Sequence, residues 1–416
     1  MKLRSTGILI LSSLLFVSLS SFSQERVKIV TYNILNYPDN SNAQNPRFQR
    51  IMSEIDADIV VVQEIQSQLA VNEFRSQVLG DDYLSGDFMN GPDTDNAIFY
   101  KDTLFSFIGT ESIYPSQGPR AISVFKLFHN FTLDSLIIYS AHFKASDGPD
   151  NEARRFNEAA TLRVFTDMLP VGTDFILVGD LNLYRSTEPA YEELLVQDGT
   201  GYFLDPIDTP GDWNNSFTYR FIHTQSTRTT DLGDGGSTGG LDSRFDFILS
   251  SQSIIDKGGI DYVDGSYWAY GNDGNHFNLS IHDPPNDSVS TPIAIDLYLS
   301  SDHLPVVAEF DFGAVSDVED EQNLLNDFVL YQNYPNPFNP STNIRFRISG
   351  FGYVTLKVYD VLGNEIVTLI NEGKPAGSYE VDFSRDLIHQ TLTSGVYFYQ
   401  LRAGDLIETK KMLLLK

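Results

Sequence analysis

Acidic, amide and imidazole side chains occur in this sequence at places where predicted strands end. Between residues 175 and 182, four apolar residues lead to Gly179, and Asp180 and Asn182 follow two positions apart. A short, uninterrupted apolar run is typical of a strand buried on both faces, and the glycine marks its end. A carboxylate and an amide at a strand end could hold a water molecule or a phosphoryl oxygen; an Asx-rich turn is the alternative.

Residues of the same kinds occupy other predicted strand ends. Asn33 and Glu64 each follow a β-branched run, His142 ends another run, and Asp302 and His303 precede the last strand. Carboxylate and amide oxygens are ligands for Mg²⁺, and imidazole changes charge near neutral pH. One polar residue at a strand end is ordinary, but five such ends in order indicate metal-assisted hydrolysis of phosphoesters.

The segments that must position these side chains alternate between strand and helix patterns. Short apolar or β-branched runs predict strands at residues 27–32, 58–64, 96–100, 121–128, 133–142, 175–179, 244–249 and 304–312. Apolar residues at helical spacing predict helices over 45–55 and 152–169. This order favours a layered α/β domain with a mixed sheet, in which two stacked sheets lie between helices.

Two long stretches, at residues 224–242 and 261–296, lack a regular pattern and flank the strands assigned to the site. Loops of this length are usually functional rims or disordered insertions. The second stretch contains Tyr267-Trp268-Ala269-Tyr270, which is either a membrane-touching aromatic tip or buried packing.

The ends of the chain differ from this central part. Lys2 and Arg4, an apolar run at 8–17 and a series of serines predict a signal peptide over 1–23, too short in its apolar part for a membrane anchor. The expected domains are then a catalytic domain at 24–314, an acidic linker at 315–327 and a small antiparallel β-sandwich at 328–416.

The composition restricts the partners. The chain has 416 residues, no cysteine, and 28 Lys plus Arg against 56 Asp plus Glu, a formal charge of −28. Disulfides therefore cannot support the exported protein, and non-specific coating of DNA or anionic membrane is disfavoured. A nucleic-acid or phosphate substrate stays open, because a bound divalent cation can reverse the local field.

Five motifs follow one another in the central part: Thr31-Tyr32-Asn33, Val62-Gln63-Glu64, Gly179-Asp180-Leu181-Asn182, Arg244-Phe245-Asp246-Phe247-Ile248 and Ser301-Asp302-His303-Leu304-Pro305-Val306. Together they resemble the motifs of the endonuclease/exonuclease/phosphatase superfamily, which includes pancreatic-type deoxyribonuclease, abasic-site endonuclease, sphingomyelinase and inositol-polyphosphate 5-phosphatase. The resemblance implies a four-layer α/β sandwich of two stacked mixed β-sheets flanked by helices, with the site at one edge.

The resemblance also implies roles. Glu64, Asn33 and Asp302 would bind Mg²⁺, with Mn²⁺ or Ca²⁺ as alternatives. Asp180 would orient or deprotonate the attacking water, and the Asn182 amide would bind phosphate and stabilise its developing charge.

His303 would act as general base or phosphate contact, and Asp246 would hold its ring. The resemblance leaves open whether Asp180 or His303 takes the proton from water.

Further positions narrow the subfamily. His142 matches the histidine with which the deoxyribonuclease and sphingomyelinase branches contact phosphate or protonate the leaving group. Arg120 matches a phosphate-binding arginine of the deoxyribonuclease branch, with a surface arginine as the alternative. Leu35 replaces an acid of some members, so metal binding would depend more on the other ligands. Arg154 and Arg155 are expected on a solvated helix face, with support of the loop after His142 as the alternative.

The C-terminal segment carries Tyr334-Pro335-Asn336-Pro337-Phe338-Asn339-Pro340, Val358-Tyr359-Asp360-Val361-Leu362-Gly363 and Ser394-Gly395-Val396-Tyr397-Phe398-Tyr399. It resembles the type A sorting domain of the type IX secretion system, which implies passage across the outer membrane. A carbohydrate-binding or adhesive β-sandwich is the alternative.

These observations predict a secreted or cell-surface, Mg²⁺-dependent phosphodiesterase, with a nuclease as the leading reading. Its partners would be nucleic acid and the type IX secretion machinery, without stable membrane insertion. A sphingomyelinase-like or sugar-phosphate hydrolase on the same fold, and a binding module without catalysis, are the rivals. A zinc enzyme is disfavoured because cysteine and paired histidines at ligand spacing are missing.

Overall fold

The computed structural model describes residues 24–38, 43–91, 93–118, 120–256, 258–314, 329–331, 333, 336, 338–348, 352–374, 377–384, 392–404 and 406–414. The chain forms two compact units, Met1–Asp317 and Val318–Lys416, and each is described by itself. The predicted signal peptide at 1–23 and linker at 315–327 lie outside the described residues, as do parts of the motif at 334–340.

The first sheet of the first unit is mixed. Its strand order is β11-β13-β1-β2-β4-β3, and β12 also pairs with β13. Only β1 and β2 of its described pairs run parallel. The strands are β1 (Glu25–Tyr37), β2 (Ile59–Ile65), β3 (Tyr83–Ser85), β4 (Asp95–Lys101), β11 (Gly259–Tyr262), β12 (Trp268–Ala269) and β13 (Val306–Ala314).

The second sheet has the order β5-β6-β7-β8-β10-β9. It also has one parallel pair among its described strands, β7 with β8. The strands are β5 (Phe105–Ile113), β6 (Ile122–His129), β7 (Ser135–His142), β8 (Phe175–Asp180), β9 (Phe203–Leu204) and β10 (Asp246–Ser251).

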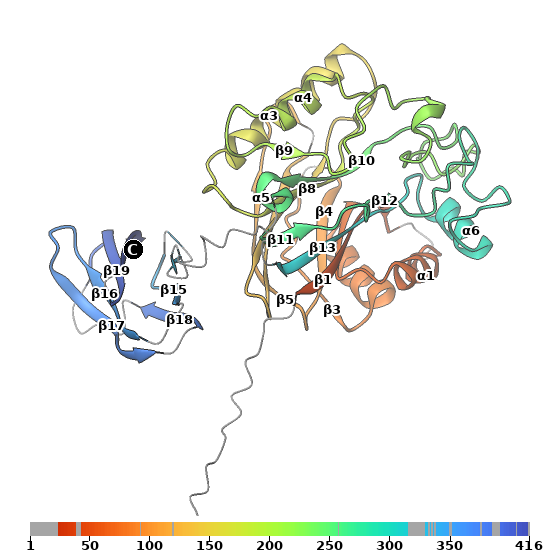
Figure 1. Ribbon diagram of the computed structural model, residues 1–416. Helices are drawn as coiled ribbons and strands as arrows, with labels where there is room; N and C mark the ends of the chain where they lie inside the picture. Colours follow the sequence, from red (N-terminus) through yellow and green to blue (C-terminus); the bar gives the residue numbers. More distant parts are fainter. Residues whose placement is uncertain are drawn as a thin grey trace, which may run out of the picture. The chain divides into compact units, whose positions relative to one another are not determined.

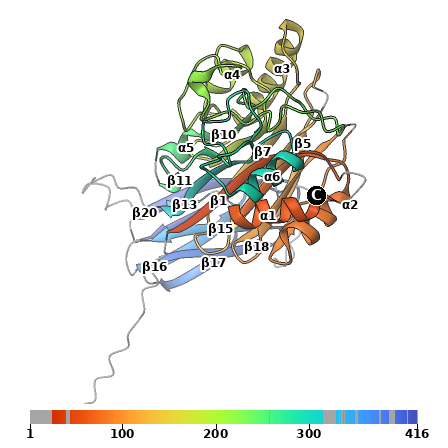
Figure 2. The ribbon, with the colours of Figure 1, turned by 90° about the vertical axis from the view of Figure 1, so that its right-hand side faces the viewer.

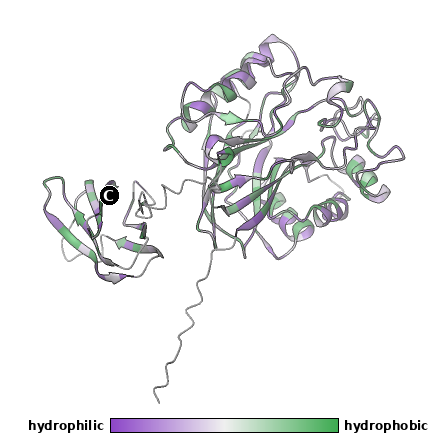
Figure 3. Cartoon of the chain, in the orientation of Figure 1, coloured by the Kyte–Doolittle hydropathy of each residue, from purple (hydrophilic) through white to green (hydrophobic). Residues whose placement is uncertain are grey.

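Helices cover the outer faces of the two sheets (Figures 1 and 2). The helices α1 (Asn45–Ile55), α2 (Gln68–Glu73), the π-helix η1 (Phe74–Leu79) and α6 (Thr291–Ser300) pack on the first sheet, and α3 (Pro149–Thr166) and α4 (Pro189–Leu195) pack on the second. The short α5 (Gln252–Ile255) and the 3-10 helix η2 (Phe217–Tyr219) complete the unit. Green and purple stripes along α1 and α3 in Figure 3 reflect their amphipathic sequences. The predicted four-layer α/β sandwich is therefore confirmed.

The inner faces of the two sheets share one apolar layer. Val27 and Ile29 of β1 and Ile176 and Val178 of β8 all belong to this layer, whereas the residues between them face the helices. Side chains alternate between the faces of a strand, so the next inward position of β8 is Asp180. The same alternation that builds the core thus aims polar side chains between the sheets at one end.

Some elements differ from the prediction. The strand predicted to end before Asn33 continues as β1 to Tyr37. The stretch 261–296 is not irregular throughout, since it contains the end of β11, all of β12 and the beginning of α6. In its aromatic run, Trp268 is 47% exposed, but Ala269 and Tyr270 are buried. The run pairs with β13, so packing rather than a membrane-touching tip describes it.

No described helix of this chain has both the length and the apolar character that crossing a membrane requires.

The second unit contains two antiparallel sheets, ordered β14-β15-β18 and β17-β16-β19-β20. Buried residues of both sheets, among them Phe346, Val358 and Tyr399, form one core. This is the predicted small β-sandwich. Its strands are β14 (Val329–Leu330), β15 (Ser341–Ile348), β16 (Gly352–Tyr359), β17 (Glu365–Lys374), β18 (Gly377–Ser384), β19 (Gly395–Ala403) and β20 (Leu406–Leu414).

Asp174, just before β8, should make the stability of the first unit depend on pH. Burial raises the pKa of its carboxyl to about 7 despite a bond from Ser253. A carboxyl that binds its proton more tightly when folded costs stability as the pH rises from about 4, its unfolded pKa, through 7.

We expect Asp174→Asn to melt at least about 2 °C above the wild type at pH 8, because the buried charge is removed, and to match it at pH 4. Thermal unfolding followed by circular dichroism measures this. The exposed Asp264→Asn is the control and should show no such trend. An equal melting temperature at pH 8 would contradict the assignment.

Candidate active site

The parallel strand pair of each sheet ends at the same edge of the first unit. In the second sheet, His142 at the end of β7 lies opposite Asp180 of β8, and Asp246 of β10 lies opposite Asp180 from the other side. In the first sheet, Asn33 of β1 lies opposite Gln63 of β2. All of these positions continue the inward rows of the apolar layer, so the edge gathers polar side chains from both sheets.

A polar layer lies between the apolar core and this edge. The Gln63 amide nitrogen donates to Thr31 Oγ1 at 3.1 Å and to Ser140 Oγ at 3.2 Å. Gln63 belongs to the first sheet and Ser140 to the second, so this amide links the two sheets directly beneath the site. The sequence prediction assigned no role to it.

Glu64 reaches the site because β2 is bulged. By alternation its side chain would face the helices, but Glu64 has φ 64° and the register shifts between Gln63 and Ile65. Such a bulge re-aims a side chain. Glu64 Oε1 then accepts from the Asn33 amide at 3.1 Å, and Oε2 accepts from the Asn36 backbone N–H at 3.0 Å.

Gly179 allows β7 and β8 to approach closely. Its φ is +129°, and a Cβ atom there would lie 2.0 Å from the Ala141 carbonyl oxygen. Only glycine fits this conformation and this space. The glycine thus sets the position of Asp180, its neighbour in the chain.

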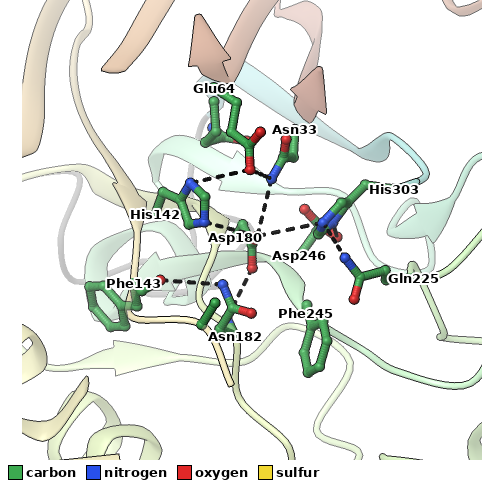
Figure 4. A network of polar contacts seen from close by, with 12 residues as sticks. Asn33, Glu64, His142, Phe143, Asp180, Asn182, Gln225, Phe245, Asp246 and His303 are labelled. Atoms are coloured by element: carbon green, nitrogen blue, oxygen red, sulfur yellow. Dashed lines mark hydrogen bonds and ion pairs between the residues drawn. The ribbon is translucent and has the colours of Figure 1, made fainter. Parts of the chain in front are cut away.

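Asp180 is the centre of the polar network (Figure 4). Its Oδ2 accepts from the Asn33 amide at 3.1 Å and lies 3.4 Å from His142 Nε2 and 3.6 Å from His303 Nε2. Its Oδ1 accepts from the Asn182 backbone N–H at 3.0 Å. Burial raises the pKa of Asp180, and the positive charge of His303 opposes this shift.

His303 and Asp246 form a buried pair. The distance from His303 Nδ1 to Asp246 Oδ2 is 2.8 Å. Burial alone would lower the pKa of His303, but Asp246, Asp180 and Asp302 together raise it well above its usual value. The carboxylates therefore favour a protonated ring.

His142 lies on the other side of Asp180 and is only 5% exposed. Burial lowers its pKa well below the usual value, and the charges of Arg120, His303 and Lys144 act in the same direction. Both effects favour the neutral form of the ring. Its Nδ1 has no hydrogen-bond partner among the described residues, although Glu64 Oε1 lies 3.8 Å away.

Asp302 faces the irregular stretch 224–242. Its Oδ2 accepts from the Gln225 amide at 3.0 Å and from the Ser237 backbone N–H at 2.7 Å. The same Gln225 nitrogen lies 2.6 Å from His303 Nε2.

Sequence analysis missed Gln225. Its position in a stretch without strand or helix pattern gave no signal beyond the expectation that this stretch forms a functional rim. The structure places the residue on the wall of the cavity.

The predicted phosphate ligand Arg120 lies at the periphery. Its Nη2 is 3.1 Å from Asp93 Oδ2, and Arg120 does not line the cavity. Its positive charge still affects the site: burial is the main cause of the low pKa of His142, and the charge of Arg120 lowers this pKa further.

Arg155 is completely buried, so the expected solvated position is wrong for this residue, whereas Arg154 is exposed. Its Nε donates to Glu188 Oε2 at 2.8 Å, and its Nη1 donates to the carbonyls of Lys144 and Ser146, both at 2.8 Å. These carbonyls belong to the segment after β7 that borders the cavity. Arg155 therefore fixes one wall of the site.

The cavity at this edge has a volume of about 240 Å³. Glu64, Asp180 and Asp302 contribute carboxylates to its lining, and Tyr184 and Phe245 contribute aromatic rings. Burial raises the pKa of Glu64, and the charge of Asp302 adds to this effect. Carboxylate oxygens that repel one another in a buried space fit a divalent cation, whose charge would relieve the repulsion.

Ligand atoms of Asp180, Asp246 and His303 also lie within 4.8 Å of one another and could hold a metal ion. However, the 2.8 Å bond between His303 and Asp246 already engages one atom of each of these two residues. We therefore read this group first as a proton-handling cluster.

Two family models match the chain. The model described as the Endonuclease/Exonuclease/phosphatase family matches residues 30–303, and that of a secretion system C-terminal sorting domain matches residues 332–415. No curated protein matches the sequence.

Several solved structures are similar. An endonuclease/exonuclease/phosphatase family protein from Bacteroides thetaiotaomicron has 18% identity and a TM-score of 0.45, covering 70% of this chain and 99% of that one. A mannosyl-6-phosphatase from the same organism has 20% identity and a TM-score of 0.45, covering 69% and 100%. Humanized TDP2 from D. rerio has 15% identity and a TM-score of 0.44, covering 68% and 98%.

Gly179→Ala should destabilise the first unit by more than about 3 kcal/mol, because the new methyl group collides with the Ala141 carbonyl oxygen in a backbone conformation that disfavours alanine. Gly172→Ala is the matched control. Gly172 also has positive φ, 82°, but its Cβ would meet nothing within 4 Å, so its cost should stay near 1 kcal/mol. Urea unfolding measures both, and equal losses would mean that the close approach is not the cause.

Proposed function

Because the chain belongs to the endonuclease/exonuclease/phosphatase family, whose members hydrolyse phosphate esters, we propose that it is a divalent-metal-dependent phosphodiesterase that cleaves nucleic acid. Its C-terminal sorting domain indicates export through the type IX secretion machinery to the cell surface or beyond. The observation that supports the catalytic proposal best is the buried Asp180 carboxylate, which has an imidazole within 3.6 Å on each side.

The proposed metal ligands are Glu64 and Asp302, with Asn33 as a third. Mg²⁺ is the expected ion, with Mn²⁺ or Ca²⁺ as alternatives; when bound, it would polarise the phosphoryl oxygens and neutralise their charge. The Asn33 amide nitrogen faces Glu64 and Asp180. Asn33 therefore also holds these two carboxylates in place.

Asp180 is the proposed acceptor of the proton from the attacking water. Asp246 keeps His303 oriented, and the surrounding carboxylates raise the pKa of His303, which favours the protonated ring. Asp180 is left as the group that can accept a proton, and burial brings its pKa upward, which makes it a stronger base. The imidazolium of His303 then stabilises the phosphate charge.

Asn182 and His142, which both contact Asp180, are proposed to bind the phosphate near its leaving group. The Asn182 amide donates to the Phe143 carbonyl at 3.3 Å and lines the cavity, where it can turn to a phosphoryl oxygen. The lowered pKa of His142 favours a hydrogen bond to phosphate over protonation of the leaving group. Arg120 would contact a phosphate only at the rim of the cavity, and only after its ion pair with Asp93 is broken.

Nucleic acid is preferred over lipid as the substrate. The lipid rival depended on an exposed aromatic tip at residues 267–270, and that segment is largely packed. The binding-module rival is disfavoured because the acids, amides and imidazoles remain within hydrogen-bonding reach of one another. Digestion of plasmid DNA, RNA and sphingomyelin liposomes by the mature protein tests this choice; cleavage of lipid alone would overturn it.

Asp180→Asn and His303→Ala should each lower the rate of DNA hydrolysis at least about a hundredfold, because each removes a group that handles the proton or the phosphate charge. The rate is measured at saturating Mg²⁺ with circular dichroism as a check on folding. His282→Ala, a histidine outside the cavity, should keep the wild-type rate. Near-normal turnover in either site variant would show that these groups are misassigned.

Glu64→Gln should raise the Mg²⁺ concentration that gives half-maximal activity at least about tenfold, because one anionic ligand is lost. Chelator should abolish the wild-type activity, and added Mg²⁺ should restore it. Mg²⁺ should also raise the melting temperature of the wild type more than that of the variant. Equal stabilisation of both proteins by Mg²⁺ would exclude Glu64 as a ligand.

A further inference from the structure

An aromatic and cationic patch lies on the surface just before the stretch 224–242. It consists of Phe217, Arg220 and Phe221, called here the 217–221 patch. Phe217 is 61% exposed and Phe221 56% exposed. The Arg220 guanidinium carbon lies 4.2 Å from the ring centre of Phe217 and 4.4 Å from that of Phe221, so the cation contacts both rings.

The backbone beneath the patch is firmly held. The Asn272 amide donates to the carbonyls of Arg220 and His223, both at 2.9 Å. Gly274 has φ +76°, and a Cβ atom there would lie 2.2 Å from the Phe221 ring, so this ring rests directly on the Gly274 backbone. Exposed aromatic residues on such a rigid support lose little conformational entropy when they bind a partner.

The patch lies close along the chain to the wall of the catalytic cavity. Phe221 precedes Gln225 by four residues, so their Cα atoms are at most about 14 Å apart. Gln225 itself contacts His303, at 2.6 Å. A polymeric substrate whose phosphate occupies the cavity therefore reaches the patch with an adjacent unit.

The chemistry of the patch fits one kind of adjacent unit. Arg220 Nη1 donates to the Phe217 carbonyl at 3.2 Å, and no described carboxylate forms an ion pair with the side chain. On a chain with a formal charge of −28, an unpaired guanidinium between two exposed rings is complementary to a phosphate next to a flat aromatic group.

We propose that the 217–221 patch binds an unpaired nucleotide next to the scissile phosphate of a single-stranded nucleic acid. The rings contact the base, and Arg220 contacts the flanking phosphate. This proposal rests on the phosphodiesterase function above and names its substrate class. Duplex nucleic acid fits less well, since its bases are already stacked on one another. A membrane surface is the competing partner, but the guanidinium that contacts both rings favours a stacked, anionic ligand.

The test measures the dissociation constant of a fluorescein-labelled single-stranded 12-mer for the full mature chain, by anisotropy, in the presence of chelator. Because no cleavage is needed, the result is independent of catalysis. Arg220→Ala and Phe221→Ala should each raise the dissociation constant about tenfold, the effect of losing one stacked base or one phosphate contact. Arg220→Ala should also reduce the salt slope by about one. Phe221→Tyr, which keeps the ring, should bind like the wild type.

Phe131→Ala is the matched control, because Phe131 is also 56% exposed but lies before β7, at the opposite end from His142. It should leave the dissociation constant unchanged. Equal affinity of all variants would overturn the proposal while leaving DNA hydrolysis by the wild type untouched. Weaker binding of the alanine variants to sphingomyelin vesicles, without any change for the 12-mer, would overturn it in favour of a membrane surface. Failure of the wild type to cleave any phosphodiester would instead refute the proposed function.

Discussion

The first unit is organised around the burial of four carboxylates at the edge between its two sheets. Glu64, Asp180, Asp246 and Asp302 gather there, and burial raises the pKa of Glu64 and that of Asp180. Their positions are held by amides, by backbone N–H groups and by the imidazolium of His303. Isolated buried charge is costly, so each carboxylate is tied to donors on separate segments of the chain. The repulsion that remains suits the site to the divalent cation proposed above.

The fold could be read from the sequence because it depends on repetition. Short apolar or β-branched runs predict β1, β7 and β8, and in the structure the alternation along these strands turns Asp180 and His142 inward at their ends. The helix pattern at 45–55 is likewise reproduced by α1. Four layers follow, because each sheet must cover both of its apolar faces.

Other parts of the site could not be predicted from the sequence, because they depend on places where the regular strand or helix pattern is interrupted or on partners far away in the chain. The bulge that turns Glu64 inward is invisible in a pattern of alternation. Gln225 lies in a segment without regular structure and acquires its position from contacts with Asp302 and His303. Arg155 was expected in solvent because a charged residue on a helix usually is, yet its carboxylate partner Glu188 is 33 residues away. Such long-range partners leave no mark on the local sequence.

The Gln63 amide that joins the sheets beneath the site has a consequence for how the protein would respond to damage in its interior. The two halves of the site belong to different sheets, and the apolar contacts between these sheets are non-directional, so they do not by themselves fix the register of the halves. A displacement of about 1 Å can lower an enzymatic rate about a hundredfold. Substitutions that loosen the packing between the sheets should therefore lower the catalytic rate while the circular dichroism spectrum stays that of a folded protein. The Gln63 amide, which binds both sheets, keeps the two halves of the site in register.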